Sequence, residues 1–276
     1  MPEPLAPAGT RTQLPGWLAL TGQQAGYQLR LLARSTRSLL AGVLLPVLVL
    51  LMRGTGAGGR GDQLTLAGGL AALGVISSAF VTHASTLVIG RESGVLRRWR
   101  MTPLPPGSFF AGKIAATVVV ADASALLTVL VAALTGAPAS AAGAAWMLIP
   151  VTAGALAWAS LGTAVSAFIP TAAAAYPLLT VTYLPIVLVS GALGTVSRPA
   201  WLATAATYLP ARPVIIATAG ALRHPGSWPV LTPGQLGVLA GWVAVGLAVA
   251  LVCFRWDPGR ARQPRRATAR LRSSPA

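Results

Sequence analysis

Between Leu64 and Ile89 the chain runs for 26 residues with His83 as the one ionisable side chain. Because an α-helix rises about 1.5 Å per residue, this stretch is longer than a helix needs to cross the roughly 30 Å hydrocarbon core of a bilayer. Other apolar runs of similar length follow it along the chain. Only 9% of the 276 residues are charged, against about a quarter in a soluble domain. We therefore predict an all-α polytopic membrane protein.

The apolar runs predict six transmembrane helices and no sizeable soluble domain. The first run is short for a full crossing, whereas the second is rich in small residues that favour close helix packing. Without a soluble domain, any energy source is expected on a separate chain. The six spans are predicted near residues 38–52, 64–89, 113–134, 144–168, 172–194 and 236–254.

The segment 195–235 does not fit a simple loop. It is moderately apolar but interrupted by six prolines, and its apolar piece 214–222 is too short to cross a bilayer. Irregular backbone is tolerated at membrane depth only where protein or water covers it. We therefore expect re-entrant or interfacial helices here, before the sixth span.

Both ends of the chain differ from the middle. Residues 1–16 are rich in proline and small residues and are expected to form a disordered cytoplasmic tail, and residues 255–276 a basic cytoplasmic tail. The transmembrane domain is expected to fill residues 17–254. Within 17–37, apolar residues are mixed with glutamine and arginine. This mixture suits a helix in the headgroup region and equally a basic flank that fixes orientation.

Positive charge is unevenly divided between the two sides of the predicted bundle. With six spans both termini share a side, and that side holds sixteen of the 21 Lys and Arg residues. By the positive-inside rule, the termini and the loop 91–113 are cytoplasmic. The net charge of +16 is thus explained by topology, and nucleic-acid binding is not expected. The abundance of Ala, Gly and Arg indicates a GC-rich bacterial source, so the expected location is the bacterial cytoplasmic membrane.

The loop between the second and third spans reads RESGVLRRWRMTPLPPGSFFAGK, from Arg91 to Lys113. Its three prolines stiffen the chain, and its arginines are suited to pairing with carboxylates on a partner. Holding the loop on the cytoplasmic side needs arginines but no prolines. The pattern therefore favours a structured docking surface for a soluble partner.

Part of this loop is similar to a phosphate-binding loop. Gly107, Gly112 and Lys113 have the required spacing, but Ile114 stands where a Ser or Thr binds magnesium, and no strand precedes the motif. We expect no cofactor to be bound by this chain, and Lys113 is expected to mark the cytoplasmic mouth of the third span.

With these features in place, residues 27–254 resemble a known family, the membrane permease subunits of type-2 ABC exporters, which includes daunorubicin-resistance and other drug or polysaccharide export permeases. The resemblance is carried by the loop 91–113, by LARSTRSLLAGVLLPVLVLLM at the first span, and by SGALGTVSRPAWLATAATYLPARP before the sixth. All three occur in the family's order.

The resemblance implies a division of labour. Two permease subunits, identical or related, sit on two ATP-binding subunits that hold ATP and magnesium, and a short coupling helix after the second span carries their movement into the membrane. The expected substrate is a hydrophobic or amphipathic small molecule, with drug efflux and antibiotic resistance as the expected roles. The residues that match the family's coupling segment are Arg91, Glu92, Gly94, Leu96, Arg97, Arg98, Arg100, Thr102, Pro103 and Leu104.

Two ionisable side chains, His83 and Asp122, lie within predicted spans. Such residues are costly in a membrane and usually face a partner or a wet cavity, so both are candidates for the substrate path, and Asp122 for contact with a cationic substrate. A hydrogen-bonded packing site between helices is the alternative. Trp158, Tyr176 and Tyr183 are suited to facing either substrate or lipid.

Two other functions compete with the exporter. A proton-driven secondary transporter would use Asp122 and His83, but the chain lacks the inverted repeat of many such folds. An intramembrane enzyme is disfavoured, because the sequence shows neither metal-ligand spacing nor a nucleophile with a base. The chain is therefore expected to be a non-catalytic transport subunit.

Overall fold

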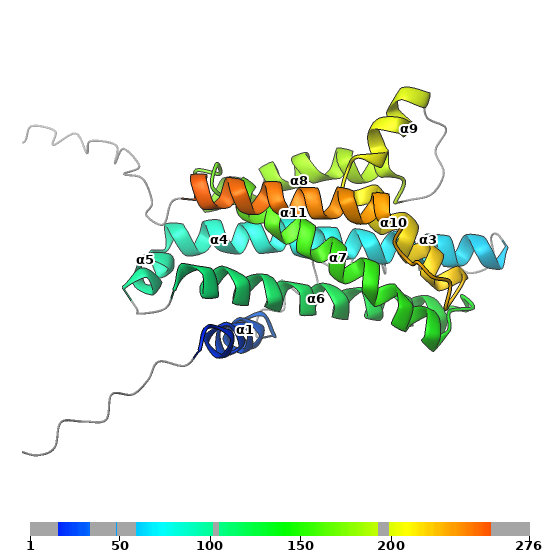
Figure 1. Cartoon of the computed structure of the whole chain (residues 1–276), viewed down its shortest axis with the longest axis horizontal. Coiled ribbons are helices and arrows are strands. Elements are labelled where there is room, and N and C mark those ends of the chain that lie inside the picture. The colour runs from blue at the N-terminus through cyan, green and yellow to red at the C-terminus, as the bar shows by residue number, and fades with distance from the viewer. Residues whose placement is uncertain (1–15, 34–47, 49–58, 102–104, 193–198, 255–276) are drawn as a thin grey trace, which may run out of the picture.

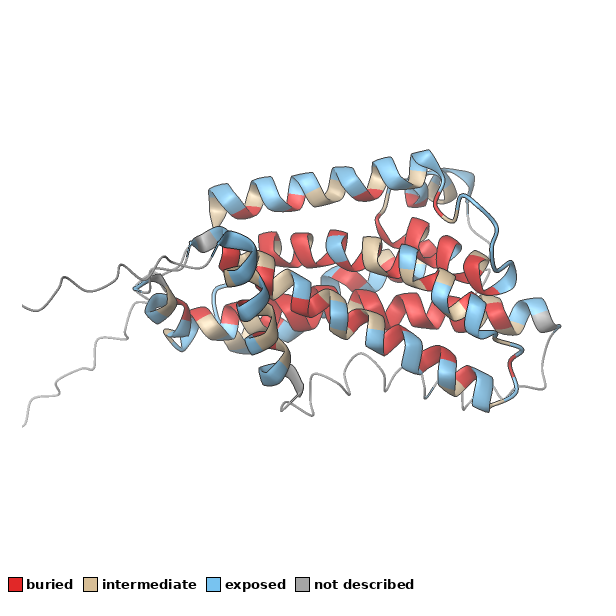
Figure 2. Ribbon diagram, turned by 60° about the horizontal axis from the view of Figure 1, so that its bottom comes forward, coloured by how far each residue is buried: buried red, intermediate tan, exposed pale blue. Residues whose placement is uncertain are grey.

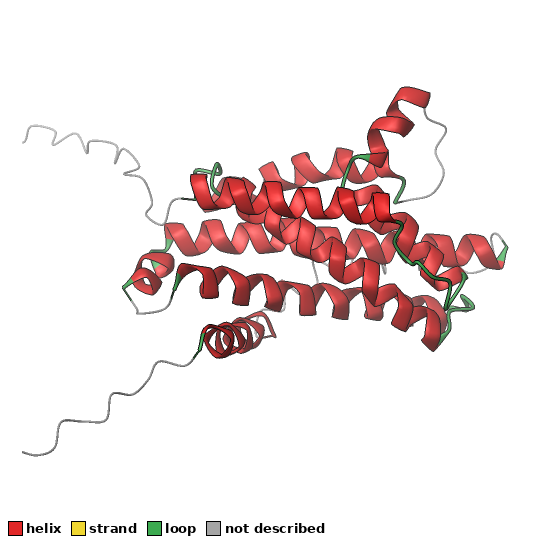
Figure 3. Ribbon diagram, in the orientation of Figure 1, coloured by secondary structure: helices red, strands yellow, loops and turns green. Residues whose placement is uncertain are grey.

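The computed structural model describes residues 16–33, 48, 59–101, 105–192 and 199–254. Within these ranges every regular element is a helix, and the longest helices run along a common axis (Figures 1 and 3). The predicted first span, 38–52, and the two predicted tails lie outside the described residues, apart from Leu48 and Gly16.

Among the described residues, five helices are long and apolar enough to cross a membrane. A continuous helix, Gly61–Glu92, covers the predicted span 64–89, and helices overlap each of the four later predicted spans, the first of them beginning at Pro106 instead of residue 113. The predicted all-α, multi-pass class is therefore confirmed. The four later spans are α6 (Pro106–Leu134), α7 (Ala141–Ser166), α8 (Ala172–Ser190) and α11 (Pro233–Cys253).

The Gly61–Glu92 span changes its helical form midway. The helix α3 (Arg60–Ile76) passes into a π-helical segment, η1 (Ser77–Thr82), and then into α4 (His83–Glu92). A π-helical turn takes in an extra residue, so the residues after it face a direction about 100° away from the one an unbroken α-helix would give them. The direction in which α4 presents His83 therefore depends on η1.

Two short helices, α9 (Ala200–Thr207) and α10 (Ala211–Arg223), occupy the predicted irregular segment. With 13 residues, α10 is about 20 Å long, too short to cross a bilayer. It packs against α3 and α7, and most of its residues are buried. The fit is close: a Cβ atom on Gly68 of α3 would lie 2.6 Å from the Cα of Ala219.

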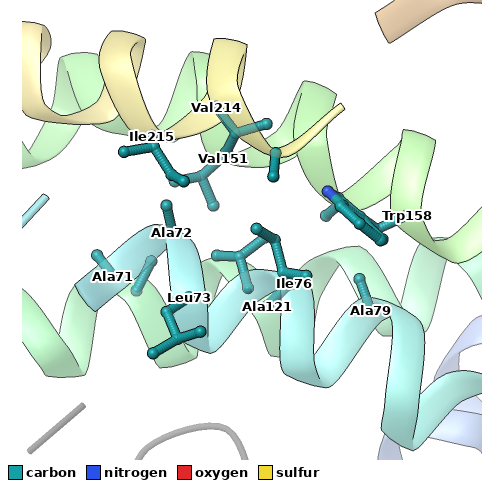
Figure 4. Packing of buried hydrophobic residues seen from close by; sticks show 14 of the residues in the cluster. Ala71, Ala72, Leu73, Ile76, Ala79, Ala121, Val151, Trp158, Val214 and Ile215 are labelled. Atoms are coloured by element: carbon teal, nitrogen blue, oxygen red, sulfur yellow. The ribbon is translucent and has the colours of Figure 1, made fainter. Parts of the chain in front are cut away.

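The core is centred on α3 and η1. In the most apolar window of the Gly61–Glu92 span, 83% of the residues are buried, against 22% for α8 and 17% for α11. Buried residues accordingly gather in the middle of the bundle (Figure 2). Figure 4 shows Ala72 and Ile76 of α3 close to Val151 of α7 and Val214 of α10. The outer helices α8 and α11 therefore present apolar surface outward, as lipid contact requires.

The first described helix, α1 (Trp17–Ala33), lies across the bundle axis and against α6 (Figure 1). It buries the polar Gln24 and Gln28 and exposes the apolar Leu18 and Leu31. Gln23 and Arg30 are exposed too, so the outward side of the helix mixes apolar and polar side chains. Such a mixture suits a helix in the headgroup region.

Candidate functional site

The segment predicted to contain the coupling helix includes α5 (Val95–Arg100), a six-residue helix at one end of the bundle (Figure 1). Gly94 begins it with φ at +74°, a left-handed conformation that glycine adopts without strain. Leu96 is 3% exposed and packs with Leu87 of α4 and Phe109 of α6. Arg97 and Arg98 are exposed. We call this the α5 end of the bundle. Of the predicted coupling residues, the side chain of Arg100 and all of Thr102, Pro103 and Leu104 lie outside the described set.

Aromatic side chains tie α5 to its neighbours. Trp99 lies 5.7 Å from Tyr27 of α1 and 5.8 Å from Phe109, measured between ring centroids. Phe109 contacts Phe110, which in turn contacts Phe254 after the end of α11 at 4.9 Å. Such pairs are each worth about 0.5–1.5 kcal/mol beyond the area that they bury. Four parts of the chain are thereby joined at the α5 end.

The structure places Arg91 differently from the sequence-based prediction of a residue that faces a partner. Its guanidinium is buried and donates hydrogen bonds to the backbone carbonyls of Ser166 (3.2 Å), Ala167 (3.4 Å) and Ile169. The last carbonyls of a helix lack intrahelical partners and carry partial negative charge. Arg91 therefore caps the C-terminus of α7.

Glu92 makes the complementary contact. Its carboxylate accepts a hydrogen bond from the backbone N–H of Ala172, the first residue of α8. An anion at a helix N-terminus satisfies a free N–H and interacts favourably with the helix dipole. Arg91 and Glu92 thus hold both sides of the turn between α7 and α8. We call these two side chains and this turn the Arg91–Glu92 clamp.

The clamp was missed from sequence because its partners are backbone groups some 75 to 80 residues away. One signal was present. The turn 169–171 carries no charge, and a topology of six spans with cytoplasmic termini puts it on the same side of the membrane as the loop that begins with Arg91 and Glu92. A cation is most favourable at the C-terminus of a helix that has no charge of its own there, and an anion is most favourable at such an N-terminus.

His83 bridges three helices at the start of α4. Its Nδ1 lies 2.7 Å from the hydroxyl of Thr117 on α6, and its Nε2 lies 2.9 Å from the hydroxyl of Thr163 on α7. Each threonine hydroxyl also donates to the carbonyl four residues earlier, at 2.9 Å. A neutral ring has one donor and one acceptor, so one of the two hydroxyls must then turn its proton to the ring. The geometry is that of a packing joint with saturated hydrogen bonds.

Asp122 lies elsewhere in the bundle and is half-buried. Both of its carboxylate oxygens lie near the hydroxyl of Thr152 on α7, at 3.2 and 3.1 Å. A single hydroxyl supplies one proton, so the carboxylate keeps capacity for further hydrogen bonds or for a cation. His83 and Asp122 therefore bind to different threonines, and the structure shows no direct contact between them.

The three predicted aromatic candidates differ in exposure. Trp158 is 1% exposed, in an edge-on contact with Phe80 at 5.3 Å, so its ring lies in the core and not at a lipid or path surface. Tyr183 is buried in α8. Tyr176 is 43% exposed. Of these three side chains, Trp158 and Tyr183 therefore belong to the buried core, whereas Tyr176 lies at the surface of α8.

The decoy motif 107–113 lies inside the first two turns of α6. A phosphate-binding loop needs backbone N–H groups that are free to surround an anion, and an α-helix uses these groups from its second turn onward. Lys113 itself is partly exposed to two neighbouring cavities between α1, α4, α5 and α6.

Comparison with known proteins identifies the family. Comparison with curated proteins finds no match. The sequence profile of the family described as ABC-2 type transporter matches residues 25–222, which cover most of α1, the first four spans found here, α9 and nearly all of α10. A match over well more than half of the residues, together with the membrane-length helices, establishes that the chain belongs to the ABC-2 type transporter family.

Proposed function

We propose that this chain is the export permease of an ATP-driven transporter, in which two permease subunits, identical or related, sit on two separate ATP-binding subunits. Chains of the ABC-2 type are membrane subunits of ABC transporters, normally partnered by an ATP-binding subunit and often dimeric. On this proposal the present chain binds no cofactor, and ATP and magnesium bind to the partner. The α5 end faces the cytoplasm of a bacterial cell, as the distribution of arginine favours.

The observation that carries the proposal is the way α5 is mounted. Arg97 and Arg98 are exposed at the end of the bundle, while Leu96 on the same short helix is buried against α4 and α6. An acidic surface on a soluble partner would pair with the arginines. Because Leu96 and Trp99 anchor α5, a push on its outer face is passed to the helices behind it.

The Arg91–Glu92 clamp extends this connection. The clamp fixes the end of α4, and hence the start of α5, to the end of α7 and the start of α8. On this proposal Arg91 and Glu92 serve coupling from inside the bundle, and Arg97 and Arg98 serve it from outside. Movement of α5 then reaches four spans at once: α4, α6, α7 and α8.

The proposed cargo is a drug-like, antibiotic or lipid-like amphipathic compound. Asp122 is the candidate contact for a cationic cargo, because its carboxylate is only half-buried and accepts a hydrogen bond from the Thr152 hydroxyl alone among the described residues. The competing proton-driven mechanism lacks a comparable observation. His83 is bonded to two threonines, and no carboxylate is hydrogen-bonded to it in the described part of the chain.

The proposal is tested by mild extraction of the tagged protein from its native membrane. We expect a soluble-type chain with ATPase activity to copurify, and the permease alone to hydrolyse no ATP. A single cysteine at Met101, which is 84% exposed beside α5, should then crosslink to that chain when Cys253 is replaced by serine.

A cysteine at Leu134 is the matched control, because Leu134 is 78% exposed at the opposite end of the bundle. It should form no crosslink to the ATPase. Substrate movement by the isolated chain under a proton gradient, with no copurifying ATPase, would overturn the proposal and make Asp122 and His83 the residues to study.

A further inference from the structure

A cavity of about 300 Å³ lies between α1, α4, α5 and the beginning of α6. It is separate from Asp122 and Thr152, which do not line it. Its volume equals that of about ten water molecules in the liquid and stands at the lower end of the range for small-molecule sites. The cavity therefore suits a slender ligand.

The walls of this cavity are largely apolar. Leu96, Trp99 and Phe109 line its inner side, where they anchor α5 and the start of α6. Tyr27 and Leu31 of α1 line it as well, and both are about half-exposed, at 49% and 53%. An apolar wall that continues outward onto the apolar face of α1 offers a path for a hydrocarbon chain from the membrane surface.

One cation lines the cavity together with these apolar groups. Among the described residues, Lys113 is the only charged residue of the lining, and no carboxylate pairs with it. Gln28 and Thr86 line the cavity too, and the three also line a second space of about 20 Å³, large enough for about one water molecule. The hydroxyl of Thr82 borders that space and has no hydrogen-bond partner within the described part of the chain. Lys113 thus lies near groups that can form hydrogen bonds.

We propose that this cavity binds a single-chain anionic amphiphile of the fatty-acid type. Its carboxylate pairs with the ammonium of Lys113, and its chain lies along Leu96, Trp99 and Phe109 toward α1. An ammonium inside a membrane protein is costly without an opposite charge, and a carboxylate that also accepts from the side-chain amide of Gln28 supplies one. Burial of the hydrocarbon chain against the apolar walls makes binding more favourable.

Other ligand classes fit less well. A nucleotide or a phosphorylated sugar needs several donors around its phosphates, whereas this cavity offers one cation and mostly hydrocarbon. A cationic amphiphile would meet the like charge of Lys113. A phospholipid has two chains, which exceed the volume. The observations therefore favour one chain and one anionic head.

The ligand would affect transport only through the proposed function, because it would brace α5 against α1 and α6. Binding itself does not depend on that function. If binding requires Lys113 but no ATPase copurifies, the site stands and the exporter proposal fails. If the ATPase copurifies and Lys113 is irrelevant to binding, the opposite holds.

The test uses the full chain in nanodiscs of phosphatidylcholine and a photoactivatable dodecanoate with a diazirine near the end of its chain. We expect label on peptides of α1, α5 and the start of α6, and competition by dodecanoate but not by dodecanol or dodecylammonium. Lys113→Met should weaken competition by about tenfold or more, whereas Lys113→Arg keeps the charge and should retain most of it.

A second variant guards against misfolding of Lys113→Met. Ser93→Trp places a large ring at the edge of the cavity and leaves Lys113 in place. It should reduce labelling while the chain keeps its size-exclusion profile. Equal competition by all three amphiphiles, or label spread over the outer faces of α8 and α11, would show non-specific partition and overturn the proposal.

A final experiment decides whether the bound anion is a transported cargo or a resident lipid. Proteoliposomes that contain the permease with its ATPase are given labelled dodecanoate and ATP. Movement that Lys113→Met abolishes would make the amphiphile a cargo. Retention of bound dodecanoate without movement would make it a resident lipid of the coupling region. Both results require that the cavity binds dodecanoate, and they differ in whether the bound molecule is transported.

Discussion

The two sides of the last turn of α4 are built in opposite ways. On the side of α7 and α8, Arg91 and Glu92 have their charged groups bonded to the backbone of the next turn. On the side of α1 and α6, Lys113 has no carboxylate partner among the described residues and borders a cavity of about 300 Å³. One side is closed by hydrogen bonds, and the other is open.

The difference teaches how charge is used at this end of the bundle. Where helix ends supply unsatisfied carbonyl and N–H groups, a charged side chain becomes a fixed structural joint. Where the neighbouring groups are mainly aromatic and aliphatic side chains with a few uncharged polar groups, the charge has no opposite charge to pair with and leaves room for a ligand. The same helix turn thereby carries a rigid connection and an adaptable one.

Removal of Arg91 should produce the largest effect on this contrast. Arg91→Met leaves the carbonyls of Ser166, Ala167 and Ile169 without their donor, and hydrogen bonds to charged groups are worth about 1.5–3 kcal/mol each. We expect a loss of about 3 kcal/mol or more in the free energy of unfolding, seen as a lower unfolding midpoint in detergent.

Arg98→Met is the matched control, since Arg98 is exposed on α5. It should leave the unfolding midpoint nearly unchanged and lower the recovery of the ATPase in copurification. Equal destabilisation by the two substitutions would remove the distinction between an inner clamp and an outer contact.

Displacement of α1 from α6 should have the second largest effect. A Cβ at Gly112 would lie 2.8 Å from the side chain of Gln24 and 2.9 Å from the carbonyl of Thr21. Gly112→Leu should therefore push α1 away from α6, at a cost of about 1–3 kcal/mol for overpacking, and reduce labelling in the cavity. Gly107→Ala is the control, because its nearest atom is 3.8 Å away, on Trp17. Unchanged labelling in Gly112→Leu would mean that α1 is not a wall of the site.

Neutralisation of Glu92 comes third. Glu92→Gln keeps an oxygen that can accept from the N–H of Ala172 but loses the charge that favours a helix N-terminus. We expect a loss of about 0.3–1 kcal/mol, measurable as a small shift of the unfolding midpoint. Glu92→Ala should cost more, because it removes the acceptor too. If Gln and Ala behave alike, the charge and not the hydrogen bond carries the contact.

Loss of one bond to His83 should have the smallest effect. Thr163→Val removes the hydroxyl 2.9 Å from Nε2 and keeps the shape of the side chain. Hydrogen bonds between membrane helices average about 0.6 kcal/mol, so we expect destabilisation near that value and unchanged ATP-driven transport. Abolished transport with unchanged stability would restore His83 as a functional group of the path.

The spans were predictable from sequence because a bilayer crossing needs only length and apolarity. The helix predicted to begin at 113 begins instead at Pro106, because Phe109 and Phe110 extend it into the aromatic contacts of the α5 end. Trp158 was ambiguous for a related reason: an indole suits lipid, substrate and core alike, and only packing against Phe80 decides among them.

The clamp and the cavity were less accessible to sequence. Arg91 and Glu92 were found as a conspicuous pair, but backbone partners carry no mark in the side-chain pattern. The cavity depends on the crossing of α1 over α6, which Gly112 permits without predicting it. Lys113 was identified as a boundary residue, and its isolation from carboxylates could be seen only with the helices in place.

The π-helical segment Ser77–Thr82 also sets the direction in which the later residues of this span point around the helix axis. Deletion of a single residue there would shorten the helix by only about 1.5 Å, yet it would rotate α4 about the helix axis by about 100°. His83 would leave Thr117 and Thr163, and Arg91 would leave the end of α7, in one event. The six residues of η1 thus determine at once whether His83 and Arg91 reach their partners.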